Sequence, residues 1–233
     1  MYNFRRGLIG QLLEHGYQVN IVAPRDKWST KLEELGCSTV TFNYDSKSVN
    51  PFRDLAILYR YWCFYRSLKP MVALNYTIKP VIYGALAASI CGISIISVVP
   101  GLGTAFIHDN IITHVVKFLY RLSLNKSEHV IFENIDDLEL FRRQKLVSVG
   151  ISERIAGPGV DTDHFKPKPA KDNDPLIFLY IDRLLWDKGI GELVEASKML
   201  RDKGILVRVQ LLGPAATKNK SSVGIDKVKA WEN

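Results

Sequence analysis

Apolar residues along the chain form short continuous runs that alternate with stretches of helical spacing. The clearest run is residues 176–181 (LIFLYI), which is bounded by proline and charge and is typical of a buried parallel strand. Residues 190–200 then carry apolar side chains with helical spacing, and residues 206–212 form a second apolar run before a Gly-Pro pair. This order of strand, helix and strand predicts a complete βαβ unit.

The same alternation is present in the residues before this unit, and it predicts an α/β fold. Helical spacing and helix-end residues predict helices in residues 1–16, 32–36, 50–69, 81–91, 111–123 and 133–141. Apolar runs predict strands in residues 17–24, 37–42, 70–75, 93–99 and 129–132, with loops at 76–80 and 100–106. This order is typical of a doubly wound parallel sheet, whose usual opening strand and glycine turn we expect to be missing.

A segment rich in proline and charge, residues 166–175 (KPKPAKDNDP), predicts a linker between two domains. We therefore expect an N-terminal Rossmann-like domain in residues 1–165 and an incomplete second domain in residues 176–233. The periodic pattern fades after Pro214, and about sixty residues are too few to close a doubly wound sheet of their own.

Composition and charge restrict the classes of partner. The chain has 233 residues, of which 47% are hydrophobic, so it can bury a sizeable core. Its net charge of +7 implies an anionic partner, which is a nucleotide sugar, an acidic lipid surface or a nucleic acid. Nucleic acid is the least favoured of these, because the cations are dispersed and no recognised motif accompanies them.

Cysteine and histidine usage predicts no metal site. The three cysteines are an odd number without paired spacing, which indicates neither a disulfide framework nor a zinc site and fits the cytoplasm. The histidines also lack metal-ligand spacing. No apolar run reaches the length that spans a bilayer.

Arg183 and Lys188 lie in the predicted connection between the first strand and the helix of the βαβ unit. In parallel α/β sheets, ligands bind outside the carboxyl ends of the strands, where helix N-termini attract anions. Arg183 would supply a planar fork of N–H groups, Lys188 a point charge, and Gly189 room for a close backbone approach to one diphosphate. On spacing alone, two ordinary surface cations explain the pattern equally well.

Residues 50–69 combine several large aromatic side chains with Arg53, Arg60, Arg66 and Lys69. A basic aromatic helix of this kind can lie on an anionic membrane surface. The alternative is a helix that packs its apolar face into the core and presents a basic face to solvent. We favour the alternative, since aromatic stripes are more often part of a core, and both interpretations stay open.

Residues 182–189 (DRLLWDKG) and 157–167 (GPGVDTDHFKP) together resemble the donor loop and the interdomain passage of the retaining glycosyltransferases of family 4. The resemblance implies a GT-B fold and transfer of a sugar, with retained configuration, from a nucleotide diphosphate sugar. The acceptor it implies is a saccharide or a polyprenyl diphosphate-linked glycan in surface polysaccharide or glycan biosynthesis. By the same resemblance, Arg183, Lys188 and Gly189 hold the donor diphosphate without a metal or other cofactor, and the catalytic residues stay unassigned.

The resemblance also places several loops beside the cleft between the two domains. The residues of these loops are Lys79, Gly101, Gly103 and Asn134. Lys79 is expected to meet an acceptor phosphate. The two glycines either allow a close backbone approach to a ligand or form a structural turn. A cytoplasmic protein, peripheral on the inner face of a membrane, fits a lipid-linked acceptor.

Two features of the family have no counterpart in this sequence. They are a donor-domain segment with two glutamates and the opening glycine loop. We therefore expect a chain truncated at both ends, with little or no transferase activity alone. The alternative function is a non-catalytic module, derived from such an enzyme, that binds carbohydrate or a membrane surface.

Overall fold

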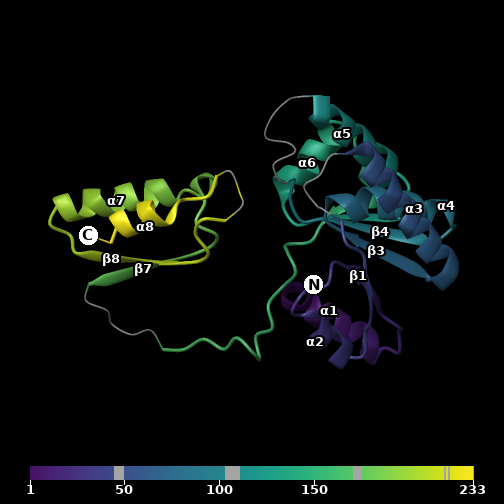
Figure 1. The fold of residues 1–233 in the computed structure, drawn as a ribbon, viewed down its shortest axis with the longest axis horizontal. Coiled ribbons are helices and arrows are strands. Elements are labelled where there is room, and N and C mark those ends of the chain that lie inside the picture. The colour runs from purple at the N-terminus through teal and green to yellow at the C-terminus, as the bar shows by residue number, and fades with distance from the viewer. Residues whose placement is uncertain (45–49, 103–110, 170–174, 218, 220, 233) are drawn as a thin grey trace. The chain divides into compact units, whose positions relative to one another are not determined.

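The computed structural model describes residues 1–44, 50–102, 111–169, 175–217, 219 and 221–232. The chain divides into two compact units, Met1–Phe165 and Lys166–Asn233, which are described one at a time (Figure 1). The main elements of unit 1 are α1 (Tyr2–Glu14), β1 (Asn20–Ala23), α2 (Ser29–Glu34), β2 (Ser38–Thr41), α3 (Pro51–Leu68), β3 (Val72–Tyr76), η1 (Pro80–Gly84), α4 (Ala85–Ile90), β4 (Ser94–Val99), α5 (Ile111–Leu124), β5 (His129–Phe132), α6 (Ile135–Arg143), η3 (Val149–Ile151) and β6 (Ser152–Arg154). Those of unit 2 are β7 (Leu176–Ile181), η4 (Trp186–Lys188), α7 (Ile190–Asp202), β8 (Val207–Leu212) and α8 (Ile225–Ala230).

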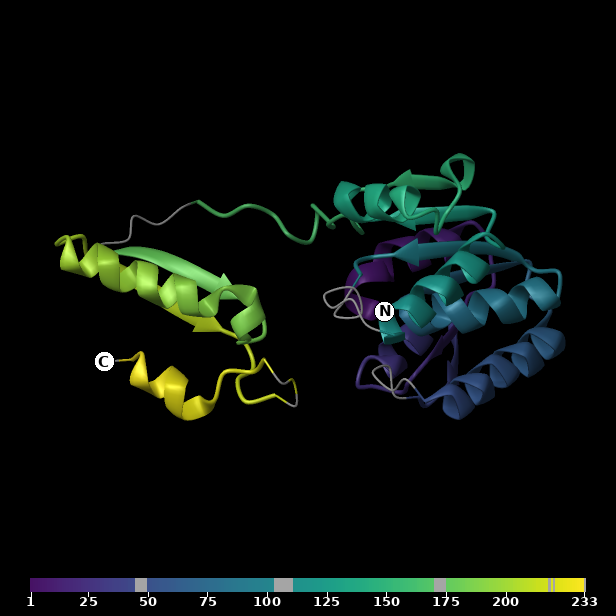
Figure 2. The same ribbon diagram turned by 90° about the horizontal axis from the view of Figure 1, so that it is seen from above.

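The described strands of unit 1 form two parallel sheets. In one sheet β3, β4, β5 and β6 pair in that order, and in the other β1 pairs with β2. The registers place Leu74 opposite Ile96 and Val98 opposite Ile131. Parallel strands need crossover connections, and the connecting helices α3, α4 and α5 lie side by side (Figure 2). The predicted α/β fold with parallel sheets is therefore confirmed.

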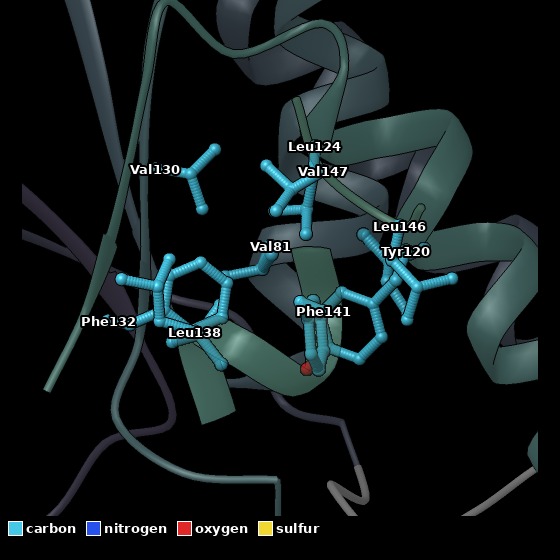
Figure 3. Close-up of a cluster of buried hydrophobic side chains, with 11 residues drawn as sticks. Val81, Tyr120, Leu124, Val130, Phe132, Leu138, Phe141, Leu146 and Val147 are labelled. Atoms are coloured by element: carbon cyan, nitrogen blue, oxygen red, sulfur yellow. The ribbon is translucent and has the colours of Figure 1, made fainter. Parts of the chain in front are cut away.

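The largest core of unit 1 lies where α5 and α6 meet β5 (Figure 3). Phe141 is fully buried there between two rings that it meets edge-on, with ring centres 5.3 Å from Tyr120 and 5.2 Å from Phe132. Burial of such a side chain stabilises the fold by about 1.5–3 kcal/mol, and a favourable ring pair adds about 0.5–1.5 kcal/mol. This packing fixes α6 against β5 and so positions Glu133 and Asn134, the two residues that join them.

α3 begins with a capped first turn and packs one face into a second core. The Asn50 side chain accepts hydrogen bonds from the N–H groups of Phe52 and Arg53, at 3.0 and 3.2 Å, and Pro51 occupies the first helical position. The large side chains buried on this face are Ile57, Tyr61 and Tyr65. The core-facing interpretation of residues 50–69 is therefore confirmed for one side of the helix.

Unit 2 contains the predicted βαβ arrangement. β7 and β8 are parallel along their whole length, from Leu176 opposite Val207 to Ile181 opposite Leu212. α7 makes the crossover between them and buries Ile190 in the core of the unit. The local pattern alone predicted these elements correctly, because each is long enough to show its own period.

The loop predicted at residues 76–80 is wrong. The chain becomes helical at Ile78, and Lys79 already has helical torsion angles, with φ −67° and ψ −46°. Pro80 is tolerated here because the first turn of a helix needs no N–H from it. Helical winding continues through η1, which has a π-type turn, into α4.

Two short elements were not predicted. β6 is a three-residue polar strand that exists through its pairing with β5, where Phe132 lies opposite Arg154. α8 lies in the segment after Pro214, where the pattern fades, and it is followed by Trp231, which packs edge-on against Trp186 at 5.8 Å. Elements this short depend on tertiary partners and carry too little periodicity to be recognised.

Candidate functional site

The candidate donor site lies at the carboxyl ends of β7 and β8. β7 ends at Ile181 and delivers Asp182 and Arg183, while β8 ends just before Gly213. The two backbones approach closely here, since a Cβ atom added to Gly213 would lie only 1.8 Å from the carbonyl oxygen of Asp182. Only glycine fits at this position. The sequence pattern indicated only that a strand ends at Gly213, and it did not reveal the close approach of the Asp182 carbonyl.

Lys188 forms an ion pair with Asp182, the residue before Arg183. Its Nζ lies 3.1 Å from Oδ2 of Asp182, and both side chains are partly exposed. The hydrogen bond from Lys188 lowers the pKa of Asp182, and the N–H of Arg183, 2.6 Å from Oδ1, acts in the same direction. The structure therefore places the Lys188 ammonium at the strand end from which Arg183 projects. The Arg183 side chain is exposed.

Gly189 joins this loop to the N-terminus of α7. Its φ of +73° is left-handed, a conformation that favours glycine, and it closes the turn η4. An added Cβ would have only Glu192 Oε2 near it, at 3.9 Å, so the torsion angle rather than space requires glycine. No described side chain caps α7, so the first N–H groups of the helix keep their anion-binding capacity.

The loop between β7 and α7 is held by the segment after Pro214. The N–H of Trp186 donates to the Ser221 carbonyl at 2.8 Å, and the N–H of Asp187 donates to Ser221 Oγ at 3.1 Å. Leu185 forms an antiparallel bridge with Ser222. Residues that carried no recognised pattern therefore support the loop that carries the candidate chemistry.

The Trp186 ring covers the start of α7. A Cβ at Gly191 would lie 3.0 Å from Cζ3 of Trp186, so this ring packs directly on the helix backbone. The Trp231 ring packs edge-on against the Trp186 ring, with ring centres 5.8 Å apart. The two indoles hold η4 against α7 and leave Lys188 at the margin of the loop.

Among the expected acceptor-side residues, Lys79 is buried rather than exposed. It is 6% exposed, and its Nζ lies 2.6 Å from Oδ1 of Asp54. The other carboxylate oxygen accepts a hydrogen bond of 2.9 Å from the Tyr83 hydroxyl, whose pKa is raised mainly by burial and also by this bond. The expected contact of Lys79 with an acceptor phosphate would require the ammonium to leave this ion pair.

Asn134 caps α6. Its Oδ1 accepts the N–H of Asp137 at 2.8 Å, and its Nδ2 donates to the Asp137 carboxylate at 2.7 Å. Gly101 has a negative φ, and an added Cβ would meet no described atom within 4 Å, so nothing in the described part of the chain requires glycine there. Gly103 lies outside the described residues.

Sequence reasoning missed a cluster at the carboxyl ends of β3 and β5. The Arg5 guanidinium donates to Glu133 at 2.6 Å and lies 4.5 Å from the centre of the Tyr76 ring. Thr77, directly after β3, has a φ of +69°, which is strained for a β-branched residue. Glu133 follows a predicted strand and could have been noticed, but its partner lies 128 residues away in the sequence.

Neither a metal cluster nor a membrane-spanning helix occurs in the described ranges. No three His, Cys, Asp or Glu side chains gather there in a way that could bind a metal ion. None of the helices that the structure describes combines the length and the apolar character needed to cross a bilayer.

With this geometry established, comparison with known proteins identifies the family. Residues 2–134 match the glycosyl transferase 4-like family. The chain belongs to this family. It is 27% identical over 231 residues to a Campylobacter jejuni N,N'-diacetylbacillosaminyl-diphospho-undecaprenol alpha-1,3-N-acetylgalactosaminyltransferase, and the match covers 90% of this chain and 60% of that protein. A second relative, the putative colanic acid biosynthesis glycosyltransferase WcaL of Escherichia coli, is 32% identical over 80 residues, which are 34% of this chain and 20% of that protein.

Solved structures support the GT-B fold. A glycosyltransferase from Rickettsia africae aligns over 99% of this chain and 62% of its own, with a TM-score of 0.68 and 15% identity. Sucrose-phosphate synthase from Thermosynechococcus elongatus aligns over 97% of this chain and 59% of its own, with a TM-score of 0.69 and 15% identity. Anabaena HepE in complex with UDP and glucose aligns over 97% and 60%, with a TM-score of 0.65 and 16% identity. The chain thus spans about 60% of the length of its curated relative in C. jejuni.

Proposed function

We propose that this chain binds a nucleotide diphosphate sugar and takes part in transferring the sugar to a saccharide or polyprenyl-linked acceptor in glycan biosynthesis. The observation that carries the proposal is the Lys188–Asp182–Arg183 arrangement at the end of β7, beside an uncapped helix N-terminus, in a glycosyl transferase 4-like chain. The curated relatives are named as transferases, so a non-catalytic module is not favoured.

The chemistry of this arrangement is stabilisation of a leaving group. When the sugar departs, negative charge develops on the nucleotide diphosphate. Arg183 offers two or more N–H groups in one plane, Lys188 offers a mobile positive charge, and the N–H groups at the start of α7 would add hydrogen-bond donors for the phosphates. Fixed dipoles and cations of this kind lower the barrier without a metal ion. We propose retained configuration at the transferred sugar, as in the glycosyltransferases that the donor loop resembles.

Asp182 orients Lys188 before a ligand binds. The pair is partly exposed, and exposed pairs of this kind contribute little to stability. Lys188 can therefore exchange Asp182 for a diphosphate oxygen at low cost.

The acceptor side of the proposal comes from the relatives. The C. jejuni enzyme is named for an acceptor carried on diphospho-undecaprenol. We propose an acceptor of the same class for this chain, which requires work at the cytoplasmic face of a membrane. Anabaena HepE was solved with UDP-glucose, which supports a uridine nucleotide as the first donor to test.

Nucleotide protection against unfolding tests the donor site. Uridine and guanosine diphosphates at about 100 times their Kd are expected to stabilise the chain by about 2.7 kcal/mol, read as a rise in Tm. Arg183→Ala removes a charge-assisted contact and is expected to weaken binding by tenfold or more, since each such bond contributes about 1.5–3 kcal/mol. Arg201→Ala, in the last turn of α7, is the matched control. Equal loss in both variants, or no protection of the unmodified chain by any nucleoside diphosphate, would refute the proposal.

A further inference from the structure

The outer face of α3 carries a second apolar stripe. We call the side chains of Phe52, Leu55, Tyr59 and Trp62 the outer stripe, because their spacing of three and four residues places them along one side of the helix. Phe52 is 83% exposed, Leu55 63% and Tyr59 61%. Figure 2 shows α3, in blue, along the outer edge of unit 1. α3 is therefore apolar on two sides, and the outer side is largely exposed.

Phe52, Leu55 and Tyr59 of the outer stripe are largely exposed, whereas Trp62 is partly buried and also packs against the second core. Ile57, Tyr61 and Tyr65, on the other side of the helix, already make the core contacts. Within the stripe, the rings of Tyr59 and Trp62 contact each other, with centres 5.7 Å apart. An exposed row of large side chains on a helix that is already anchored is typical of a docking surface.

The exposed charges of the segment that begins at Leu55 have one sign. From Leu55 to Leu102 the sequence contains no Asp or Glu, while Arg60, Arg66, Lys69 and Lys79 lie in this segment. Lys79 is buried and neutralised by Asp54, as described above. The cations that this segment presents to solvent therefore have no acidic neighbour within it.

An open groove of about 830 Å³ lies at the carboxyl end of α3. Its lining includes Trp62 from the outer stripe, the cations Arg66 and Lys69, and Ile90 from the end of α4, which is 67% exposed. The Arg66 guanidinium lies 5.0 Å from the centre of the Trp62 ring. None of the described residues that line the groove is acidic. Two cations beside an aromatic ring and an exposed aliphatic side chain match the chemistry of a lipid phosphate and its acyl chains.

We propose that the outer stripe and this groove form the surface by which unit 1 docks on an anionic lipid bilayer. Phe52, Leu55 and Tyr59 enter the interfacial region, while Arg66 and Lys69 bind lipid phosphates. This inference rests on the proposed function in one respect, which is that the acceptor is carried by a membrane lipid.

A bilayer explains the surface better than the other occupants do. A nucleic acid would use the cations but would leave Phe52 and Leu55 in water. A second copy joined through a two-fold axis would cover the apolar side chains, but neither the outer stripe nor the described lining of the groove offers an acidic residue to pair with Arg66 and Lys69. Exposed aliphatic and aromatic side chains, together with cations in a segment that has no acidic residue, fit an interface that is both apolar and anionic.

Vesicle co-sedimentation tests the surface with two pairs of variants. The full chain is mixed with phosphatidylcholine vesicles that do or do not contain phosphatidylglycerol. Leu55→Glu is paired with Val149→Glu, an exposed aliphatic position elsewhere on unit 1, and Arg66→Glu/Lys69→Glu is paired with Arg121→Glu/Lys126→Glu. Each pair has the same change in net charge, so a difference within a pair reports position. The unfolding midpoint of each variant confirms that it is folded.

The expected result is binding that requires phosphatidylglycerol. Each cation near an anionic surface contributes roughly fivefold to partitioning, so the Arg66/Lys69 variant is expected to lose about 25-fold or more. Leu55→Glu is expected to lose at least about fivefold, and both controls much less. If the α3 variants bind as well as their controls, this surface is wrong although membrane association stands. If the unmodified chain does not bind anionic vesicles at all, both this inference and the membrane part of the proposed function are overturned, while nucleotide protection still judges the donor site. A dimer that Leu55→Glu dissociates, with vesicle binding unchanged, would make the stripe a self-interface and refute the proposal.

Discussion

Gly213→Ala is expected to damage the candidate donor site more than any other small substitution in unit 2. The new Cβ would lie 1.8 Å from the carbonyl oxygen of Asp182, and non-bonded carbon atoms do not approach oxygen closer than about 3 Å. The clash is with backbone, so no side-chain rotation relieves it. The end of β8 or of β7 must move by about 1 Å or more, which distorts the pairing of Ile181 with Leu212 and shifts Asp182 relative to Lys188.

The magnitude follows from the cost of overpacking. Extra atoms in a packed site cost about 1–3 kcal/mol, and a backbone clash belongs at the upper end of that range. About 3 kcal/mol corresponds to an approximately 100-fold faster amide exchange for β7 and β8 when exchange occurs by local opening. Hydrogen-exchange mass spectrometry measures this separately for unit 2, so the stability of unit 1 does not obscure the result.

Gly224→Ala is the matched control for this substitution. A Cβ there would meet no described atom within 4 Å, and its φ of −68° suits alanine. The change is expected to stay within about 1 kcal/mol, since it affects only the start of a short helix. If peptides from β7 in Gly213→Ala exchange at the rate of the control, the close approach of the two strand ends is wrong, and with it the described geometry of the donor loop.

Three further predictions concern polar side chains with a defined partner. Lys79→Met leaves the Asp54 carboxylate buried without its cation and is expected to cost about 3–5 kcal/mol in urea unfolding, whereas adding Asp54→Asn should recover part of this loss. Asn134→Ala removes the cap of α6 and is expected to cost about 0.5–2 kcal/mol, with Asn134→Ser, which keeps an N-cap oxygen, as the tolerated control. Lys188→Ala is expected to raise the pKa of Asp182 towards its ordinary value, followed by carboxyl NMR. The stability that this carboxylate contributes is lost as the pH falls through its folded-state pKa, and in Lys188→Ala this acid-dependent loss should become smaller because the folded-state and unfolded-state pKa values move together.

The elements that the sequence predicted correctly are those whose signals are local. β7, α7 and β8 each show their own hydrophobic period, and Gly189 stands where a helix begins after a loop. Asn50 and Pro51 mark the start of α3, because asparagine is favoured as a helix cap and proline at the first helical position. Local signals of this kind need no knowledge of the rest of the fold.

The positions that sequence reasoning misjudged depend on partners far away in the chain. Lys79 looked like a loop cation because its partner, Asp54, lies 25 residues earlier. The outer stripe was hidden for a related reason, since the aromatic content of residues 50–69 did not reveal that only one of two apolar sides is buried. Burial is decided by neighbouring elements, and a sequence window of one helix contains none of them.

The donor loop shows how the two kinds of information combine. An Arg and a Lys at the right spacing specify which charges can meet a diphosphate, and this spacing is visible in the sequence. The conformation of the loop that carries these cations depends on a distant segment. Ser221, which lies 34 residues after Asp187 in the sequence, accepts a hydrogen bond from the Asp187 N–H, and Trp231 packs on Trp186. The motif in the βα loop therefore does not define the binding site by itself. The segment that supports the loop also decides whether Arg183 and Lys188 can contact the same diphosphate. Substitutions at Ser221 or Trp231 should weaken nucleotide binding although neither residue belongs to the motif, and this is the feature that separates a positioned diphosphate site from two surface cations.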